Sequence, residues 1–235
     1  MRRRLEVVAR SGAVLCLATA TAFAQSADGA TRHAEMAALD QYLMPRAEEI
    51  QLARSAAPPS ISDAAAVWIL GRDGYTQAAP GGNGFSCLVE RSWSAGLDDP
   101  DFWNPKLRAP ICFNAAAARY FLPLLNLRTR AIFEKRSKDA LKERVRHAVE
   151  KGELPALAEG AMCFMMSRSG YLGDEFGHWH PHLMFFEPKA GPADWGSNLN
   201  GSPVIAFTDP LDGVTTFLVP VQHWSDGTVD PAAAH

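Results

Sequence analysis

Residues 177–187 read Gly-His-Trp-His-Pro-His-Leu-Met-Phe-Phe-Glu, and the interpretation of the chain starts from this histidine segment. Three of the seven histidines (His178, His180 and His182) occupy alternate positions and lead into an apolar run. Alternate side chains of a strand point to the same face of a sheet, so we expect the three imidazoles to share a face. Pro181 cannot donate to a sheet ladder and indicates an edge, a bulge or the mouth of a cleft.

The spacing of the histidines limits how an ion could use them. In a straight strand the α-carbons of His178 and His182 are roughly 13 Å apart, whereas zinc–nitrogen bonds are about 2.0–2.1 Å long. We therefore predict that two adjacent histidines bind zinc or another divalent transition metal together with a third ligand. The candidates for that ligand are Asp174, Glu175, His223 and Glu187. The alternatives are a metal-free polar cluster lining a pocket and a purely structural role.

The first 24 residues have the pattern of a bacterial signal peptide. Arginines at positions 2–4 precede a short apolar run over residues 11–23, and Ala22-Phe23-Ala24 matches a signal-peptidase site. The run is shorter than the about 20 residues that span a bilayer. We therefore expect export to the periplasm or medium, with no membrane span in the mature chain.

The remaining chain predicts one domain preceded by a helical segment. Residues 25–60 are expected to form an N-terminal helix, from Thr31 to about Ser55, and a linker, and residues 61–230 a single domain. The formal net charge of −3 gives no reason to expect a nucleic-acid partner. Residues 128–146 hold eight basic and three acidic side chains, which we interpret as a solvated helix face rather than an anion site.

Three cysteines remain after the predicted cleavage. We pair Cys87 with Cys112, because each lies in a short apolar stretch beside turn-rich sequence, and place Cys163 in the core. No C-x-x-C motif occurs, so neither a thiol-redox motif nor a thiolate zinc knuckle is indicated.

Hydrophobic patterning predicts an α+β fold, with helices grouped on one face of an antiparallel sheet. Strands are expected over residues 64–70, 75–77, 85–90, 161–167, 204–207 and 215–221 and in the histidine segment. The first three should form a meander, and the histidine strand should pair with residues 161–167 and with a late strand. Helices are expected over residues 114–122, 124–135 and 137–151. The aspartates at positions 98, 99 and 101 lack the spacing of a calcium loop.

Three functional hypotheses follow. The first is an exported metal-dependent hydrolase, in which Asp174, Glu175 or His223 acts as a general base or orients a ligand. The second is a non-catalytic periplasmic protein that binds a small ligand, a metal or haem in a pocket lined by the histidines and by tryptophans, principally Trp93, Trp103 and Trp179. The third, a Cys87–histidine nucleophile pair, conflicts with the predicted disulfide.

Three stretches also carry a family resemblance: residues 66–75, residues 102–108 (Phe-Trp-Asn-Pro-Lys-Leu-Arg) and residues 177–185. Together they resemble a group of exported bacterial proteins to which no activity is assigned. The resemblance covers nearly the whole mature chain. It implies bacterial export and supplies no catalytic residue.

Overall fold

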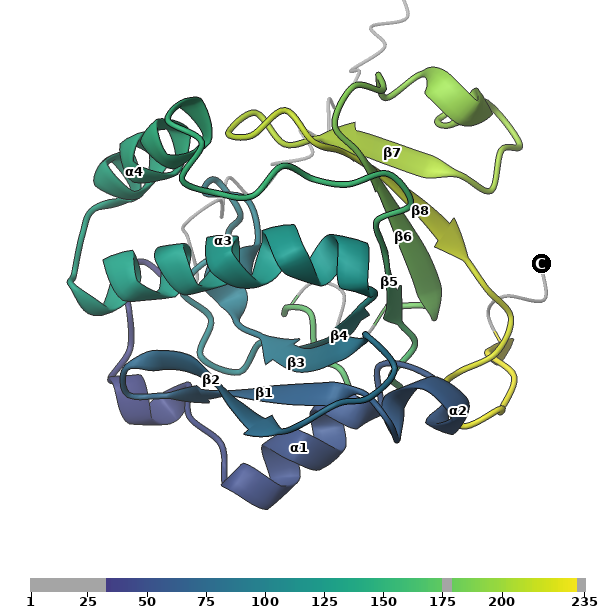
Figure 1. The fold of residues 1–235 in the computed structure, drawn as a ribbon, viewed down its shortest axis with the longest axis horizontal. Coiled ribbons are helices and arrows are strands. Elements are labelled where there is room, and N and C mark those ends of the chain that lie inside the picture. Colours follow the sequence, from purple (N-terminus) through teal and green to yellow (C-terminus); the bar gives the residue numbers. More distant parts are fainter. Residues whose placement is uncertain (1–32, 175–178, 232–235) are drawn as a thin grey trace, which may run out of the picture. The chain divides into compact units, whose positions relative to one another are not determined.

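The computed structural model describes residues 33–174 and 179–231, which lie in one compact unit, Thr31–His235. The fold is α+β, as predicted, with an eight-stranded, mostly antiparallel sheet in the order β2-β1-β3-β4-β5-β6-β8-β7 (Figure 1). Its strands are β1 (Ala66–Gly71), β2 (Gly74–Ala79), β3 (Ser86–Glu90), β4 (Ala109–Phe113), β5 (Met162–Met165), β6 (His182–Glu187), β7 (Ile205–Thr208) and β8 (Thr215–Pro220). The predicted signal peptide lies outside the described residues.

The first three strands correct the predicted meander. β1 and β2 form an antiparallel hairpin, but β3 pairs with β1, in parallel, instead of with β2. The connection between β2 and β3 crosses the start of β1, where the Gly82 N–H donates to the Ala64 carbonyl at 2.8 Å. A Cβ at Gly81 would lie 2.1 Å from the Ala66 nitrogen. The glycine therefore permits the close passage that returns the chain to the same end of the sheet.

The histidine segment enters the sheet where it was expected to. β6 begins at His182 and pairs antiparallel with β5 and β8, so the predicted hairpin with residues 161–167 and the late-strand partner are confirmed. His182 lies opposite Met165 on one side and Pro220 on the other. The strand starts directly after Pro181, whose ring nitrogen has no hydrogen to donate.

The main helices have the caps that the sequence indicates. The helices are η1 (Leu39–Gln41), α1 (Arg46–Arg54), α2 (Pro59–Ser62), η2 (Ser92–Ser94), α3 (Ala115–Phe133), α4 (Lys138–Glu150) and η3 (Asp194–Gly196). Asn114 caps α3 and Ser137 caps α4, each by accepting from a backbone N–H of the first turn. The predicted break near Pro123 is wrong, because α3 continues through it. A proline in the interior of a helix costs about 3 kcal/mol. We attribute the continuity of α3 to its burial against the sheet, which offsets this cost.

The two faces of the sheet have separate cores. On one face α3 packs on the strands and α4 packs beside α3, and α1 lies against the other face (Figure 1). Side-chain alternation in β4 divides the two cores: Ile111 and Phe113 join the larger core under α3, and Cys112 joins the smaller core under α1.

The N-terminal segment is helical over a shorter range than predicted. Between residues 33 and 55 only α1 and the single 3-10 turn η1 are helical, and Pro45 lies directly before α1. Glu49 of α1 is buried and anchors the helix to the sheet. Its carboxylate accepts from Arg91 at 2.8 Å and from the Leu70 backbone N–H at 3.0 Å.

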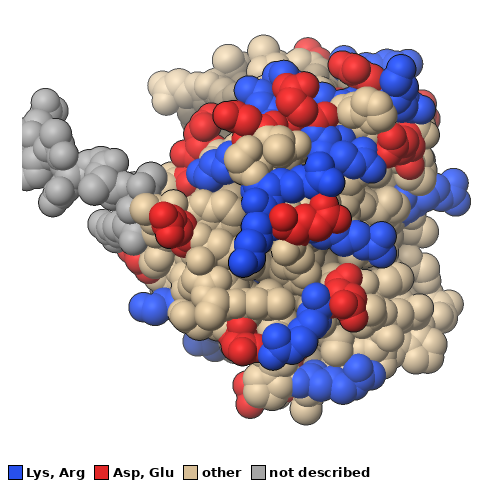
Figure 2. Space-filling model, turned by 90° about the vertical axis from the view of Figure 1, so that its left-hand side faces the viewer, with Lys and Arg blue, Asp and Glu red and all other residues tan. Residues whose placement is uncertain are grey.

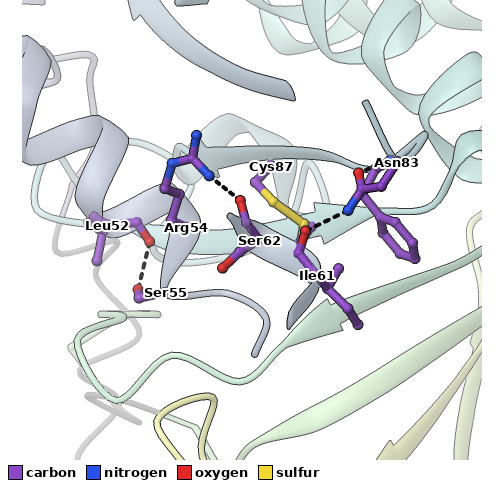
Figure 3. The surroundings of a disulfide bond; sticks show 9 residues. Leu52, Arg54, Ser55, Ile61, Ser62, Asn83 and Cys87 are labelled. Atoms are coloured by element: carbon purple, nitrogen blue, oxygen red, sulfur yellow. Dashed lines mark hydrogen bonds between the residues drawn. A yellow bond between two sulfur atoms is a disulfide. The ribbon is translucent and has the colours of Figure 1, made fainter. Parts of the chain in front are cut away.

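The predicted disulfide is present. Cys87 and Cys112 are directly paired residues of β3 and β4 and are bonded to each other, whereas Cys163 is a buried free thiol. Figure 3 shows the disulfide beside the end of α1 and α2, where the Arg54 guanidinium donates to the Ser62 carbonyl and Asn83 donates to the Ile61 carbonyl at 2.7 Å. These contacts hold the N-terminal helices over the disulfide.

Charges of both signs are interspersed on the face that Figure 2 presents. Several basic side chains of residues 128–146 are paired with acids, in Arg136–Glu134, Arg144–Glu153 and Arg146–Glu143. None of the helices in the described ranges has the length and apolarity needed to cross a membrane.

Candidate metal centre

Two of the predicted site residues, Glu175 and His178, lie outside the described residues. The histidine segment can therefore be assessed from His180 and His182. His180 lies before β6 and has a half-exposed side chain, and its Nδ1 is 2.6 Å from Oδ2 of the buried Asp230. The carboxylate accepts a hydrogen bond from Nδ1–H, and in the neutral ring Nε2 is then the nitrogen with a lone pair.

His182 is a core residue. It is 2 % exposed, and its Nδ1 lies 2.7 Å from the His180 backbone carbonyl. A carbonyl oxygen only accepts, so Nδ1 carries the proton. Burial lowers the pKa of His182, which favours the neutral ring. Its Nε2 is buried and has no hydrogen-bond partner among the described residues.

A cavity of about 20 Å³ lies beside these two histidines and is also lined by Ser167 and Trp179. This volume matches one water molecule. His180 and His182 therefore line a common space, although His180 lies outside the strand. The space is small, however, and both Nδ1 atoms are already committed to hydrogen bonds.

The other predicted residues are dispersed. His223 is exposed and forms a bridge with Val229. Trp93 is fully buried and donates its indole N–H to Thr129 at 3.0 Å, which leaves it no surface for a ligand. Trp103 packs edge-on against Phe102 and lines a cavity at the N-terminal segment. Trp179 is exposed and packs edge-on against His182.

A different group of candidate ligands comes together elsewhere in the fold, and one of them lies at the start of the described residues. His33, Asp101 and Asp174 form the one set of three metal-ligating side chains in residues 33–174 and 179–231 whose ligand atoms lie within 4.8 Å of one another. We call this group the metal centre. Asp101 comes from the loop before β4, and Asp174 from the loop after β5. Three segments far apart in sequence therefore meet there.

The distances in the metal centre suit a small cation. His33 Nε2 lies 3.2 Å from an Asp174 oxygen and 3.8 Å from an Asp101 oxygen. Ligands bonded at 2.0–2.1 Å in a tetrahedron are about 3.4 Å apart. An ion could therefore be accommodated with small side-chain adjustments. One imidazole nitrogen and two carboxylate oxygens form a donor set that zinc and related divalent metals accept.

Neighbouring groups hold the two carboxylates in place. Asn104 is fully buried, and its amide donates to Asp101 at 2.9 Å and contacts Asp174 at 3.4 Å. The Asp174 backbone N–H donates to Asp101 at 3.0 Å, and the Tyr171 hydroxyl donates to Asp174. A Cβ at Gly173 would lie 2.3 Å from an Asp101 oxygen, so the position excludes any side chain. Such outer contacts orient metal-binding carboxylates.

The same contacts keep Asp174 ionised. The hydrogen bond from Tyr171, followed by the one from His33, lowers the pKa of the Asp174 carboxyl. Conversely, the hydrogen bond to Asp174 raises the pKa of Tyr171, so its hydroxyl remains a donor. A carboxylate that is ionised at neutral pH is ready to bind a cation.

The sequence pointed to part of this centre. Asp174 was a candidate through its closeness to the histidines, and the aspartates at positions 98, 99 and 101 were considered as a calcium loop. His33 had no local signal, because the contact that brings it to Asp174 joins residues 141 positions apart.

Comparison of the chain with family models, curated proteins and solved structures finds no match. The resemblance to exported bacterial proteins therefore stays a prediction.

Proposed function

We propose that this protein binds a divalent transition-metal ion, zinc in the first instance, through His33, Asp101 and Asp174. The observation that supports the proposal is the approach of three ligand atoms from three separate segments to within 4.8 Å, at spacings near those of a tetrahedral site. Asn104 donates a hydrogen bond to Asp101 and Tyr171 donates one to Asp174, and such contacts orient metal-binding carboxylates.

The reaction class that this centre supports best is hydrolysis. Three protein ligands leave a fourth position for water, the arrangement of catalytic rather than structural zinc sites. The side chains of His33 and Asp174 are 22 % and 25 % exposed, so solvent and a substrate can reach that position. A zinc ion in such a site lowers the pKa of its water towards about 7. In this proposal Asp174 is a metal ligand, one of the roles that the sequence suggested for it, and not a general base.

Elemental analysis tests the binding step. The full chain is dialysed against a chelator, incubated with zinc and desalted. We expect about one zinc per chain, and loss of that zinc in Asp101→Asn and in Asp174→Asn. Asp226→Asn is the matched control, because Asp226 is a surface carboxylate in another loop, paired with Arg168. Full zinc retention by both metal-centre variants, with an unchanged circular dichroism spectrum, overturns the proposal.

Activity tests the second step separately. We expect the zinc-loaded protein to hydrolyse p-nitrophenyl acetate faster than the chelated protein, and the increase to be absent from Asp174→Asn. Stoichiometric zinc without any increase would retain the binding site and favour the non-catalytic alternative. That alternative is consistent with the position of the centre in loops at the surface.

A further inference from the structure

A cavity of about 150 Å³ lies between α3 and the sheet, and it shares no lining residue with the metal centre. We call it the α3 cavity. Most of its wall is apolar, formed by Ile111, Phe113, Phe121, Leu124, Leu125, Met184, Phe186, Phe207 and Val214. A cavity of about this volume accommodates a benzene-sized molecule. The wall is therefore shaped for one ring or a short alkyl chain.

Four charged side chains interrupt this apolar wall. Glu90 comes from the end of β3 and Arg128 from α3, and Asp209 and Asp212 come from the turn between β7 and β8. Arg128 was predicted on the solvated helix face, but it is only 5 % exposed. The Asp212 carboxylate accepts from the Tyr120 hydroxyl at 2.7 Å, which fastens the turn to α3.

Several polar atoms at the cavity are left without partners. Arg128 donates one Nη to the Ala95 carbonyl, but its buried Nε has no partner among the described residues, and the same is true of Ser94 Oγ. Within the described ranges no hydrogen bond or ion pair reaches the Glu90 carboxylate. Buried polar groups are normally satisfied, so these atoms indicate a polar guest.

Glu90 is the group best placed to bind that guest. Protein atoms surround the Glu90 side chain on most sides, and the part of its surface that lines the cavity remains accessible. Burial raises the pKa of its carboxyl to about 7, an effect that the charge of Arg128 partly offsets. A cation beside it would stabilise the ionised form.

The charged side chains and aromatic rings of the cavity wall together indicate which class of ligand it binds. Three carboxyl groups face the cavity against one guanidinium, so an anion would be repelled by more charges than attract it. Phenylalanine rings add favourable contacts for a cation. We infer that the α3 cavity binds a small alkyl or aryl-alkyl amine as its ammonium ion, with the ammonium at Glu90 and the apolar part among Phe113, Phe121 and Phe186.

Calorimetric titration of the full chain tests this inference with three matched probes. Benzylamine carries the ammonium, benzyl alcohol has a similar size without charge, and benzoate reverses the charge. We expect benzylamine to bind at least about tenfold more tightly than either of the others. Equal affinities for benzylamine and benzyl alcohol, or no heat of binding from benzylamine at millimolar concentration, overturn the inference.

The dependence on Glu90 is tested in two ways. Glu90→Gln keeps the shape of the side chain and removes the charge, and it should weaken benzylamine binding at least about tenfold, whereas Asp226→Asn at the distant surface should not. In the unaltered protein, affinity should fall as pH drops below 7, because Glu90 takes up a proton while the ammonium stays charged.

The other titratable groups around Glu90 also have to be considered. Arg128 stays charged, and burial keeps the Cys163 thiol protonated. Burial also raises the pKa of Asp212, so the pH dependence is assigned to Glu90 only if Glu90→Gln abolishes it while Asp212→Asn retains it. Benzylamine affinity that is flat between about pH 8 and about pH 5.5 contradicts the assignment, even if Glu90→Gln fails to fold.

Discussion

In the histidine segment both described imidazoles use Nδ1 in hydrogen bonds, one to a buried carboxylate and one to a backbone carbonyl. In the metal centre one imidazole nitrogen lies 3.2 and 3.8 Å from oxygens of two carboxylates, and the shorter contact is a hydrogen bond. His180 and His182 are two residues apart in sequence. The ligands of the metal centre come from three segments between positions 33 and 174.

The difference shows what a cluster of histidines needs before it can hold an ion. Burial turns His182 into part of the core, with its Nδ1–H committed to a backbone carbonyl and a space the size of one water beside it. In the metal centre His33 and Asp174 are partly exposed and Asp101 is buried, and Asn104 and Tyr171 orient the carboxylates without occupying every oxygen lone pair. The two regions should therefore respond to mutation in opposite ways.

The largest expected effect is on zinc affinity. His33→Ala removes the only nitrogen ligand of the metal centre and should weaken zinc binding at least about 100-fold, which corresponds to about 2.7 kcal/mol. His180→Ala should change it less than about twofold, because His180 is not a ligand in this account. Calorimetric titration of chelator-treated protein measures both. A larger loss of zinc affinity in His180→Ala than in His33→Ala would place the ion at the histidine segment instead.

The second effect is on stability. His182→Ala removes a buried side chain and its hydrogen bond, so we expect the free energy of unfolding to fall by about 2 kcal/mol. Zinc affinity should be unchanged. Urea denaturation gives the measurement, and His223→Ala, at an exposed position, should cost less than about 0.5 kcal/mol. A stable His182→Ala protein that has lost zinc would show that His182 is a ligand.

A smaller effect on zinc affinity is expected from the groups that orient the ligands of the metal centre. Tyr171→Phe removes the hydroxyl that donates to Asp174 and should weaken zinc binding about tenfold. Tyr120→Phe is a close control, since it removes another tyrosine–aspartate hydrogen bond, at the α3 cavity. The comparison uses the same titration. Equal zinc affinities in the two variants would mean that Tyr171 does not orient a ligand.

The smallest effect is the pH dependence of stability at the histidine segment. The folded protein keeps His182 neutral, because burial lowers its pKa, while an unfolded histidine takes up a proton below about pH 6.5. The stability that this histidine contributes is therefore lost as pH falls through about 6.5. Urea denaturation at pH values above and below this should show that the unprotonatable variant His182→Gln loses less stability on acidification than the unaltered protein. Equal losses of stability on acidification in the two proteins would contradict the assignment of this pH dependence to His182.

Much of the fold follows from local sequence. The α+β class, the caps at Asn114 and Ser137, the Cys87–Cys112 disulfide and the pairing of the histidine strand all depend on neighbouring residues or on apolar alternation, and the structure confirms them. The parallel pairing of β3 with β1 depends on a close passage at Gly81, and the continuity of α3 through Pro123 depends on burial. Neither has a local signature.

The functional sites were harder to predict, because they depend on contacts between distant segments. Histidine spacing identified residues that lie near one another, but it could not show that Asp230 would bind His180 from the far end of the chain. Arg128 was assigned to solvent from the charge pattern of its helix, although it is buried and lines the α3 cavity together with two aspartates of the β7–β8 turn. His33 contacts Asp174 although 141 positions separate them, and no local pattern indicates such a contact.

X-ray absorption spectroscopy of the zinc-loaded full chain tests the central claim most directly, because it counts the imidazoles bound to the metal. The metal centre predicts one imidazole together with carboxylate oxygens at about 2.0–2.2 Å. A spectrum with two or more imidazoles would place the ion at the histidine segment and contradict the account.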